Sequence, residues 1–328
     1  MPRDPGIVES SALPRPWWYT WTHDGATVPH GAAPGTRVAR MIRSLVEGDE
    51  VAIENLIRST DLLRSGWEPT APPRVPAAVQ PLLLRHQLAT GSLVGMLDET
   101  AGRVGGVILA AELDQPLRGH RTTWVVDEFH VAHPRDWITV GRSLLVSLAA
   151  RAASSGVDLV LIRTGSGDQA KRETLERTGL TRASWARRKE IGARPATPPS
   201  GVRGLVDADE TEVAPLIAAA AEHLSPTACA GNASSGGLVV DDGDGPVGVA
   251  LVRDGGTPGE TVIDPLVLCD GASWPLVGER LVDGVEWLAA SRGDRAIVVP
   301  CGPGEGLKES LLTVLGYELT EEWWTFRA

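Results

Sequence analysis

Trp124-Val125-Val126-Asp127-Glu128-Phe129-His130-Val131 is a run of β-branched and aromatic residues, and it leads through His133-Pro134-Arg135-Asp136 into Trp137-Ile138-Thr139-Val140-Gly141-Arg142. The same pattern returns 137 residues later without a gap, so that Asp127 matches Asp264, Trp137 matches Trp274, Gly141 matches Gly278 and Lys171 matches Lys308. A register kept for more than fifty residues, and falling largely on Gly and Trp, indicates an internal duplication.

Length and composition agree with two similar units. The chain has 328 residues, of which 42% are hydrophobic and 22% are charged, and this is enough material for about two cores. Its three cysteines, Cys229, Cys269 and Cys301, show no metal-ligand spacing and suit a reducing compartment. We therefore expect no metal site.

Charge is distributed unevenly between the two halves. Residues 1–200 carry 24 Lys and Arg against 21 Asp and Glu, whereas residues 201–328 carry 7 against 21. The halves should therefore treat an anionic ligand differently. No basic stripe is interleaved with aromatic residues, so nucleic acid is not an expected partner. No apolar run of about eighteen residues and no basic, apolar leader is present, which predicts a cytoplasmic protein without membrane contact.

The duplication suggests the boundaries of the units. Residues 1–35 form an arm rich in Trp and Pro, with Trp17, Trp18 and Trp21 close together. This arm is expected to pack on the body of the protein or to cover an apolar substrate. Residues 36–190 form the first domain, the Pro-rich stretch 191–201 is a linker, and residues 202–328 form the second domain. The second domain is shorter, and its second helix is expected to be absent.

Each half has the same predicted order of elements. In the first, a strand near 41–46 precedes helices near 47–57 and 79–84, and a hairpin joins 92–97 to 104–109. The central strand 124–131, a helix from 137 to about 153, a buried strand 157–162 and a short helix ending at Gly179 follow. The second half repeats strand, helix, hairpin and central unit from residue 205.

This order, together with the loop that follows the central strand, resembles the GCN5-related N-acetyltransferase (GNAT) superfamily from about residue 37 to the end. The resemblance implies the α/β (α+β) class, with two tandem folds that each have a central mixed, mostly antiparallel sheet flanked by helices. It is also similar to the arrangement of mycothiol synthases, in which one domain is active and the other structural.

The resemblance implies a site for acetyl-coenzyme A, or another acyl-coenzyme A, in the first half. The superfamily's Arg/Gln-x-x-Gly-x-Gly loop holds the pyrophosphate through backbone N–H groups and a helix N-terminus. Of that pattern, Gly141 matches, while Asp136 and Thr139 depart from it. The expected cofactor-binding residues are Val131, Arg135, Trp137, Ile138, Thr139, Val140, Gly141, Arg142 and Lys171. In the second half Pro275 lacks a donor and Glu279 replaces Arg142, so that copy is expected to be degenerate.

Catalysis of acetyl transfer requires a base for the amine and an acid for the leaving thiolate. The resemblance places a carboxylate base on the central strand, and the candidates are Asp127, Glu128 and His130. Alternation along the strand predicts Glu128 and His130 on one face and Asp127 and Phe129 on the other. The Tyr that serves as acid in many relatives is replaced by Leu175, and by Leu312 in the second copy. A structural role for these carboxylates, such as pairing with Arg135, is the alternative.

The sequence thus predicts an acyl-coenzyme A-dependent N-acyltransferase that transfers acetyl by direct attack of an amine, carried by a small molecule or a peptide. The Trp-rich arm allows a longer acyl chain in natural-product biosynthesis as an alternative. A third possibility is a catalytically silent protein that binds acyl-coenzyme A or acts as a scaffold. We expect a monomer or a homodimer.

Overall fold

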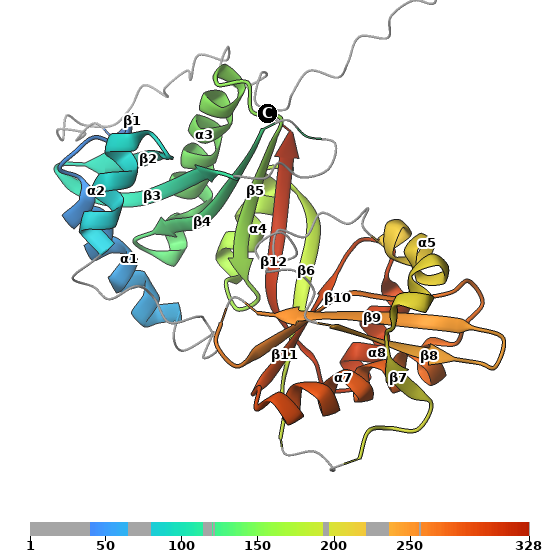
Figure 1. Cartoon of the computed structure of the whole chain (residues 1–328). Coiled ribbons are helices and arrows are strands. Elements are labelled where there is room, and N and C mark those ends of the chain that lie inside the picture. The colour runs from blue at the N-terminus through green and yellow to red at the C-terminus, as the bar shows by residue number, and fades with distance from the viewer. Residues whose placement is uncertain are drawn as a thin grey trace, which may run out of the picture.

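The computed structural model describes residues 40–64, 80–113, 120, 122–192, 197–220, 236–255 and 257–327. Its strands form one continuous twelve-stranded sheet, and the two halves of the chain lie at opposite ends of it (Figure 1). The Trp-rich arm lies outside the described residues, as does the place where the second half was expected to lack a helix. No helix in the described ranges is long and apolar enough to cross a membrane.

The first half contains the predicted elements in the predicted order. They are β1 Arg40–Ser44, α1 Glu50–Arg64, α2 Gln80–Thr90, β2 Leu93–Thr100, β3 Arg103–Glu112, β4 Thr123–Val131, a 3-10 turn Pro134–Asp136, a π-helical turn Trp137–Gly141, α3 Arg142–Ser154, β5 Leu159–Gly165, α4 Gln169–Arg177 and β6 Thr181–Glu190. The hairpin predicted from two apolar runs is β2 and β3, which pair antiparallel.

The second half repeats this order with a shorter first strand. Its elements are β7 Val202–Gly204, a 3-10 turn Asp207–Asp209, α5 Glu210–Ala220, β8 Gly236–Asp241, β9 Pro246–Asp254, β10 Glu260–Leu268, a π-helical turn Trp274–Gly278, α7 Glu279–Arg292, β11 Ala296–Cys301, α8 Gly306–Val314 and β12 Glu318–Arg327.

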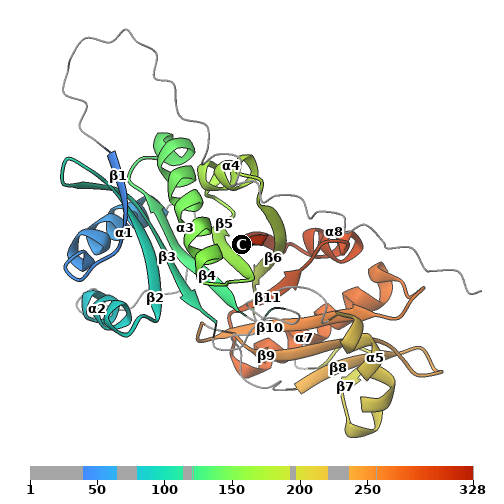
Figure 2. The same ribbon diagram turned by 90° about the horizontal axis from the view of Figure 1, so that it is seen from above.

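Helices cover both faces of the sheet in the first half. Seen from above, α1 and α2 lie on one side of β2 and β3, and α3 lies on the other (Figure 2). The α3 side is filled by the larger core, in which Leu144 and Leu148 pack on Ile108 and Val126. The α1 side is filled by a smaller core around Ile53. β5 is buried on both faces, with Val160 and Ile162 in the larger core and Leu159 and Leu161 in a small cluster with Trp323, which explains its run of apolar residues without alternation.

The last strands of the two halves are exchanged. The strand order is β1-β2-β3-β4-β5-β12-β6-β11-β10-β9-β8-β7, so the final strand of the chain lies in the sheet beside β5 of the first half. β12 pairs antiparallel with β5 from Glu321–Gly165 to Arg327–Leu159. β6, the last strand of the first half, pairs antiparallel with β11 of the second half. Each half thus completes the sheet of the other, and the sheet is continuous across the predicted linker.

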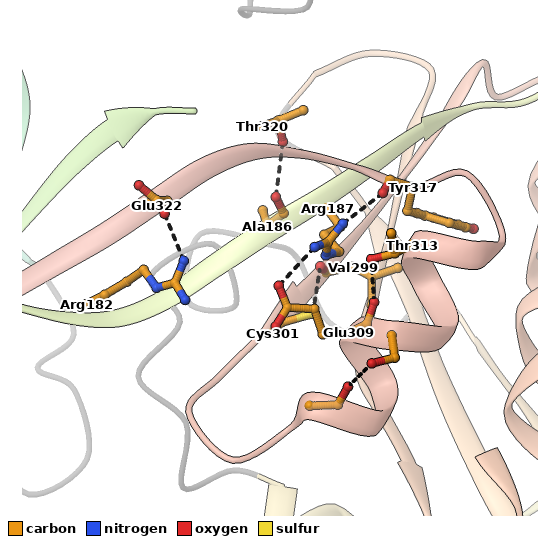
Figure 3. A network of polar contacts seen from close by, with 12 residues as sticks. Arg182, Ala186, Arg187, Val299, Cys301, Glu309, Thr313, Tyr317, Thr320 and Glu322 are labelled. Carbon is orange, nitrogen blue, oxygen red and sulfur yellow. Dashed lines mark hydrogen bonds and ion pairs between the residues drawn. The ribbon is translucent and has the colours of Figure 1, made fainter. Parts of the chain in front are cut away.

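Polar side chains hold the exchanged strands together. Figure 3 shows Arg187 of β6, whose guanidinium donates to the carbonyl of Tyr317 and to Glu309, both at 2.9 Å. The nearly buried Glu322 of β12 accepts from Arg182 of β6 at 2.9 Å. Such charge-assisted bonds between partly buried groups are costly to break, because one charge then loses its partner.

A buried acid and an Arg repeat at the first turn of both halves. Arg43 binds Asp49 through two nitrogens at 2.7 Å, and Arg203 binds Asp209 in the same way at 2.6 and 2.8 Å. Each Asp also accepts from a backbone N–H three residues earlier. The Arg203 guanidinium lowers the pKa of Asp209 to about 2. This motif is further support for the duplication, and it was not used in the sequence analysis because its two copies are not 137 residues apart.

β4 leaves its neighbour β5 partway along its length. The two strands pair in parallel only from Thr123–Leu159 to Val126–Ile162. Beyond Val126 the strand continues to Val131 while pairing with β3. Every second residue of a strand directs its N–H and C=O to the same side, so this stretch directs backbone polar groups into the gap toward β5. The gap positions the candidate site.

Candidate functional site

The first cavity lies where β4 and β5 separate, and we call it the strand-end cavity. It has a volume of about 400 Å³. Its walls come from the end of β4, from Pro134 and Trp137, from the turn after β5, from the first turn of α4, and from Thr60 of α1. The start of the 3-10 turn at Pro134 and the start of α4 at Gln169 therefore border one cavity, and the carboxylate of Asp168 caps α4 there.

The second cavity lies on the α1 and α2 side of the sheet, and we call it the helix-side cavity. Its volume is about 240 Å³. Apolar side chains form most of the wall, and Gln87 and three carboxylates, Glu54, Asp127 and Glu128, form the rest. The complete lining is Glu54, Ile57, Leu83, Leu84, Gln87, Leu93, Leu109, Ala111, Val125, Asp127 and Glu128.

Asp127 is the carboxylate of this cavity that has no partner. Glu54 pairs with Arg58 on the same helix, and Glu128 pairs with His130. The carboxylate of Asp127 makes no hydrogen bond or ion pair with any residue of the described ranges. Solvent reaches it through the cavity, but the surrounding wall desolvates it, and this burial raises its pKa against the opposing charge of Arg163. A carboxyl with a raised pKa in a cavity is suited to accept a proton.

Glu128, His130 and Thr60 form a chain of hydrogen bonds through β4. His130 Nε2 lies 2.5 Å from Glu128 Oε2, and His130 Nδ1 lies 2.7 Å from Thr60 Oγ1. The Thr60 hydroxyl also lies within reach of the carbonyls of Leu56 and Ile57. The imidazole of His130 thus lies between the Thr60 hydroxyl and the Glu128 carboxylate, and its tautomer decides which atom donates in each bond. Glu128 lines the helix-side cavity and His130 the strand-end cavity, so the pair connects the two.

The prediction from strand alternation is half wrong. Glu128 and His130 do meet, as predicted, but Asp127 lies in the same cavity as Glu128, while Phe129 packs in the core under α3. The reason is an irregularity in the pairing of β3 and β4, where the register shifts between Leu109 and Ala111. A bulge inserts an extra residue and reverses the faces beyond it. Both carboxylates therefore reach one cavity.

The segment predicted to hold a pyrophosphate is helical. The N–H of Asp136 donates to the carbonyl of His133 at 2.9 Å, and the N–H of Trp137 to that of Pro134. The π-helical turn from Trp137 to Gly141 then leads directly into α3. The first N–H groups of this segment are thus bonded inside the 3-10 turn, and its N-terminal end at Pro134 is flanked by Arg135.

Gly141 has a packing role that the sequence did not indicate. A Cβ at this position would lie 2.7 Å from the ring of Trp137, and the equivalent atom at Gly278 would lie 2.7 Å from Trp274. Trp137 is buried and meets Phe129 edge-to-face, with 4.8 Å between ring centroids. The glycine in both copies therefore allows an indole to fold over the start of the helix.

The other predicted cofactor residues lie around the same segment. Val131 lines the strand-end cavity, Val140 is buried beneath α3, and Ile138 is exposed. The carbonyl of Thr139 accepts from Arg40 at 3.2 Å. The Arg135 side chain is 84% exposed beside Asp136, and Arg142 begins α3 and is partly exposed. Arg135 and Ile138 are thus directed to solvent near the cavity mouth and do not line it.

Lys171 is buried, although a charged helix residue is usually solvated. Its Nζ donates to the carbonyl of Arg163 at 2.6 Å and lies 5.4 Å from the centroid of Phe129. Its backbone N–H is capped by Asp168 at 3.1 Å. Lys171 lines the strand-end cavity and bridges the gap between β4 and β5. The sequence placed it in the site by resemblance, and the structure shows the contacts that hold it there.

Leu175, which takes the place of the acidic Tyr, is fully buried in the larger core. It contributes nothing polar, so any acid of this site must come from another residue. Thr60, Glu54 and Arg163 are site residues that the sequence analysis missed. They come from α1 and β5, and their distance along the chain from β4 left no spacing pattern to find.

In the second half, the equivalent turn between β11 and α8 contains different side chains. Glu305 accepts from the N–H of Gly302 at 2.6 Å and pairs with the buried Lys308 at 2.7 Å. Its carboxylate therefore lies at the N-terminus of α8, where an anionic ligand would otherwise be favoured. Lys308 is the counterpart of Lys171, and here its charge is bound within the protein.

The arrangement of elements is shared with solved acetyltransferases. A GCN5-related N-acetyltransferase from Sphaerobacter thermophilus matches with a TM-score of 0.52 and 17% identity, over 88% of this chain and 95% of that one. A glucosamine N-acetyltransferase region of a fungal multi-domain β-N-acetylglucosaminidase matches with a TM-score of 0.53 and 8% identity, over 92% of this chain and 40% of that one. A tandem GNAT protein from the clavulanic acid biosynthesis pathway matches with a TM-score of 0.45 and 15% identity, over 88% of this chain and 98% of that one.

No protein-family model matches the sequence, and no curated protein matches it. The solved structures therefore establish the fold. The α+β fold of the GCN5-related N-acetyltransferases, predicted from the order of the elements, is confirmed.

Proposed function

We propose that the first half is an acyl-coenzyme A-dependent N-acyltransferase, most simply an acetyltransferase acting on an amine. One observation carries the proposal: two cavities meet at β4, one bordered by the strand backbone that has separated from β5, the other containing the Asp127 carboxylate, which has no partner among the described residues. The fold alone would not carry it, since one fold can serve many functions.

The strand-end cavity fits the extended arm of acyl-coenzyme A. The free side of β4 beyond Val126 offers backbone donors and acceptors to the amides of such an arm. The helical end at Pro134, with the exposed Arg135 and the partly exposed Arg142, would meet the phosphates. The bound coenzyme supplies an activated thioester carbonyl.

Asp127 is proposed as the base. An amine enters as an ammonium ion, and its proton must be removed before the nitrogen can attack the thioester carbon. The raised pKa of Asp127 brings this carboxylate closer to the pKa of the proton that it takes. The C–N bond then forms as the C–S bond breaks, the attacking nitrogen loses its second proton to solvent, and the leaving thiolate needs a proton.

The Glu128–His130 pair is proposed to supply that proton. His130 lines the strand-end cavity, where the thiolate would leave, and it shares a proton with Glu128. The pair thereby takes over the role that Leu175 cannot fill. Thr60 holds the imidazole in its orientation at 2.7 Å.

Two measurements test the proposal. Calorimetry should show acetyl-coenzyme A binding to the wild type and its loss in Ala170→Trp, which fills the strand-end cavity, while Ala150→Trp on the exposed side of α3 should bind normally. A thiol-release assay with a panel of amines should show Asp127→Asn at least about 10²-fold slower in kcat/KM. Coenzyme binding without turnover of any amine would instead favour a silent binding protein, and normal binding by Ala170→Trp would contradict the assigned cavity.

A further inference from the structure

The hairpins of the two halves can be superposed residue by residue from their strand pairing and from the packing of one glycine in each. Gly106 of β3 pairs with Val131, and Gly248 of β9 pairs with Leu268. Each glycine makes room for the helix that follows, because a Cβ at either would lie 2.9 Å from a leucine of α3 or α7. The two glycines are 142 positions apart, and this offset relates the two hairpins.

By the same offset, Ala111 in the first half and Arg253 in the second half occupy equivalent positions. Ala111 pairs with Val125, and Arg253 pairs with Val262, the counterpart of Val125. The Arg253 guanidinium donates to the carboxylate of Asp264, the counterpart of Asp127, and to its carbonyl at 3.4 Å. The side chain of Arg253 is 15% exposed, so its aliphatic stem is mostly covered.

The two copies of the site thus differ in one respect: the second is filled by a side chain and the first is open. In the second half, a cation on an aliphatic stem of three methylene groups lies against the Asp of the central strand. In the first half the methyl group of Ala111 stands in its place, and the helix-side cavity of about 240 Å³ opens beside Asp127. The desolvation that raises the pKa of Asp127 raises that of Asp264 as well. The second half shows which chemistry the shared architecture accommodates.

We propose that the helix-side cavity binds a small amine whose cationic head lies on Asp127 and whose body is apolar and free of carboxylate. This inference rests on the proposed function, because it names the acceptor of the same site. The apolar body of the amine would lie against Leu84, Leu93 and Leu109. It would be covered by protein, as the aliphatic stem of Arg253 is in the second half.

The size of the helix-side cavity disfavours a peptide as the acceptor, and its charge disfavours an amino acid. Cavities for drug-sized ligands span roughly 300–1,000 Å³, so a cavity of about 240 Å³ suits a smaller molecule than a peptide. A carboxylate on the ligand would enter a wall that already contains Glu54, Asp127 and Glu128. At close range, like charges in a partly desolvated site repel one another. An amino acid is therefore disfavoured relative to the corresponding amine.

Binding of three related probes tests the proposal without any acyl donor. The probes are 2-phenylethylamine, phenylalanine and 3-phenylpropionate, which share one skeleton and differ in charge. Calorimetry at pH 7.5 should show that the amine binds at least about tenfold more tightly than phenylalanine and that 3-phenylpropionate does not bind. Equal affinity of the amine and the acid, or tighter binding of phenylalanine, would overturn the proposal.

Comparison of the two halves suggests a variant that tests where the amine binds. Ala111→Arg places the side chain of the second half in the first, where it should fill the cavity, pair with Asp127 and abolish binding of 2-phenylethylamine. Acetyl-coenzyme A should still bind in the strand-end cavity, which shows that the variant is folded. Ala150→Arg, on the exposed side of α3, is the matched control and should bind the amine like the wild type. Unchanged amine binding by Ala111→Arg would contradict the assigned location.

Asp127→Asn covers the case in which Ala111→Arg does not fold. This variant preserves the shape of the cavity and should weaken the binding of 2-phenylethylamine at least about tenfold. An unchanged affinity would contradict the role given to the carboxylate. The two proposals fail separately: amine binding without thiol release would refute acyl transfer alone, and thiol release only with acceptors that carry a carboxylate would refute the acceptor class alone.

Discussion

Arg163 of β5 donates a hydrogen bond to Glu321 of β12, with Nε and Oε2 2.7 Å apart. The bond crosses from the first half of the chain to the exchanged strand of the second. Arg163 is also, together with Lys171, a cation that lowers the pKa of Asp127 against the effect of burial. The final strand of the chain therefore holds in place a charge that acts on the proposed base of the other half.

Removal of the Arg163 charge should shift the pH profile of the proposed acyl transfer. In Arg163→Gln the pKa of Asp127 rises further, because desolvation is no longer opposed by this cation. A base must be deprotonated, so the acidic limb of kcat/KM should move to higher pH. Arg163→Lys keeps the charge and should leave the limb near its wild-type position. An acidic limb that is the same in wild type and Arg163→Gln would show that Asp127 does not control it.

Replacement of Asp127 should stabilise the protein at neutral pH. In the unfolded chain an Asp has a pKa of about 3.9, and in the folded chain Asp127 has a higher one. The folded state thus binds the proton more tightly, and its stability falls as the pH rises from about 3.9 through the folded pKa. In urea unfolding, Asp127→Asn should be more stable than wild type at pH 7 and equal to it near pH 3. Exposed Glu112→Gln is the control, and a destabilised Asp127→Asn at pH 7 would contradict the prediction.

Gly141→Ala and Gly278→Ala should both destabilise the protein. A helical Gly to Ala change ordinarily gains up to about 1 kcal/mol, but here the new Cβ meets an indole ring at 2.7 Å. Overpacking of this kind costs about 1–3 kcal/mol, so the clash should prevail. Gly204→Ala, which has open space around it, should have little effect. If Gly141→Ala lost coenzyme binding with unchanged stability, a direct role in phosphate binding would be the better explanation.

Cleavage of the linker should leave the two halves together. A protease site inserted between Ala196 and Thr197 separates the chain into two pieces, yet β12 still pairs with β5 and β6 with β11. Gel filtration of the cleaved protein should give one peak at the size of the intact chain, and the pieces should separate only in denaturant. Two peaks under native conditions would show that the exchanged strands are not held in solution.

The sequence predicted the architecture well because duplication leaves a register that can be counted. The 137-residue offset identified the central unit twice, and the order of elements around it predicted the fold. The exchange of β6 and β12 was not predictable in the same way. Trp185 and Trp324 each lie in a short run of strand-forming residues, and such a run can pair equally well with either half.

The site was harder to predict than the fold, for two physical reasons. The irregularity beside Asp127 reversed the faces of β4, and a bulge has no dependable sequence signal. Arg253 was overlooked because the connection from β9 to β10 is shorter than that from β3 to β4, so its offset from Ala111 is 142 and not 137. Pairing of the strands was needed to place these two residues at equivalent positions.

The exchange of strands also bears on how such a chain changes over generations. After a duplication, a redundant copy is ordinarily free to be lost. Here β5 of the first half is completed by β12 of the second, so deletion of the second half would remove a neighbour from the strand that carries Arg163. The second half is thus free to fill its own site with Arg253 and Glu305, and yet the first half cannot dispense with it.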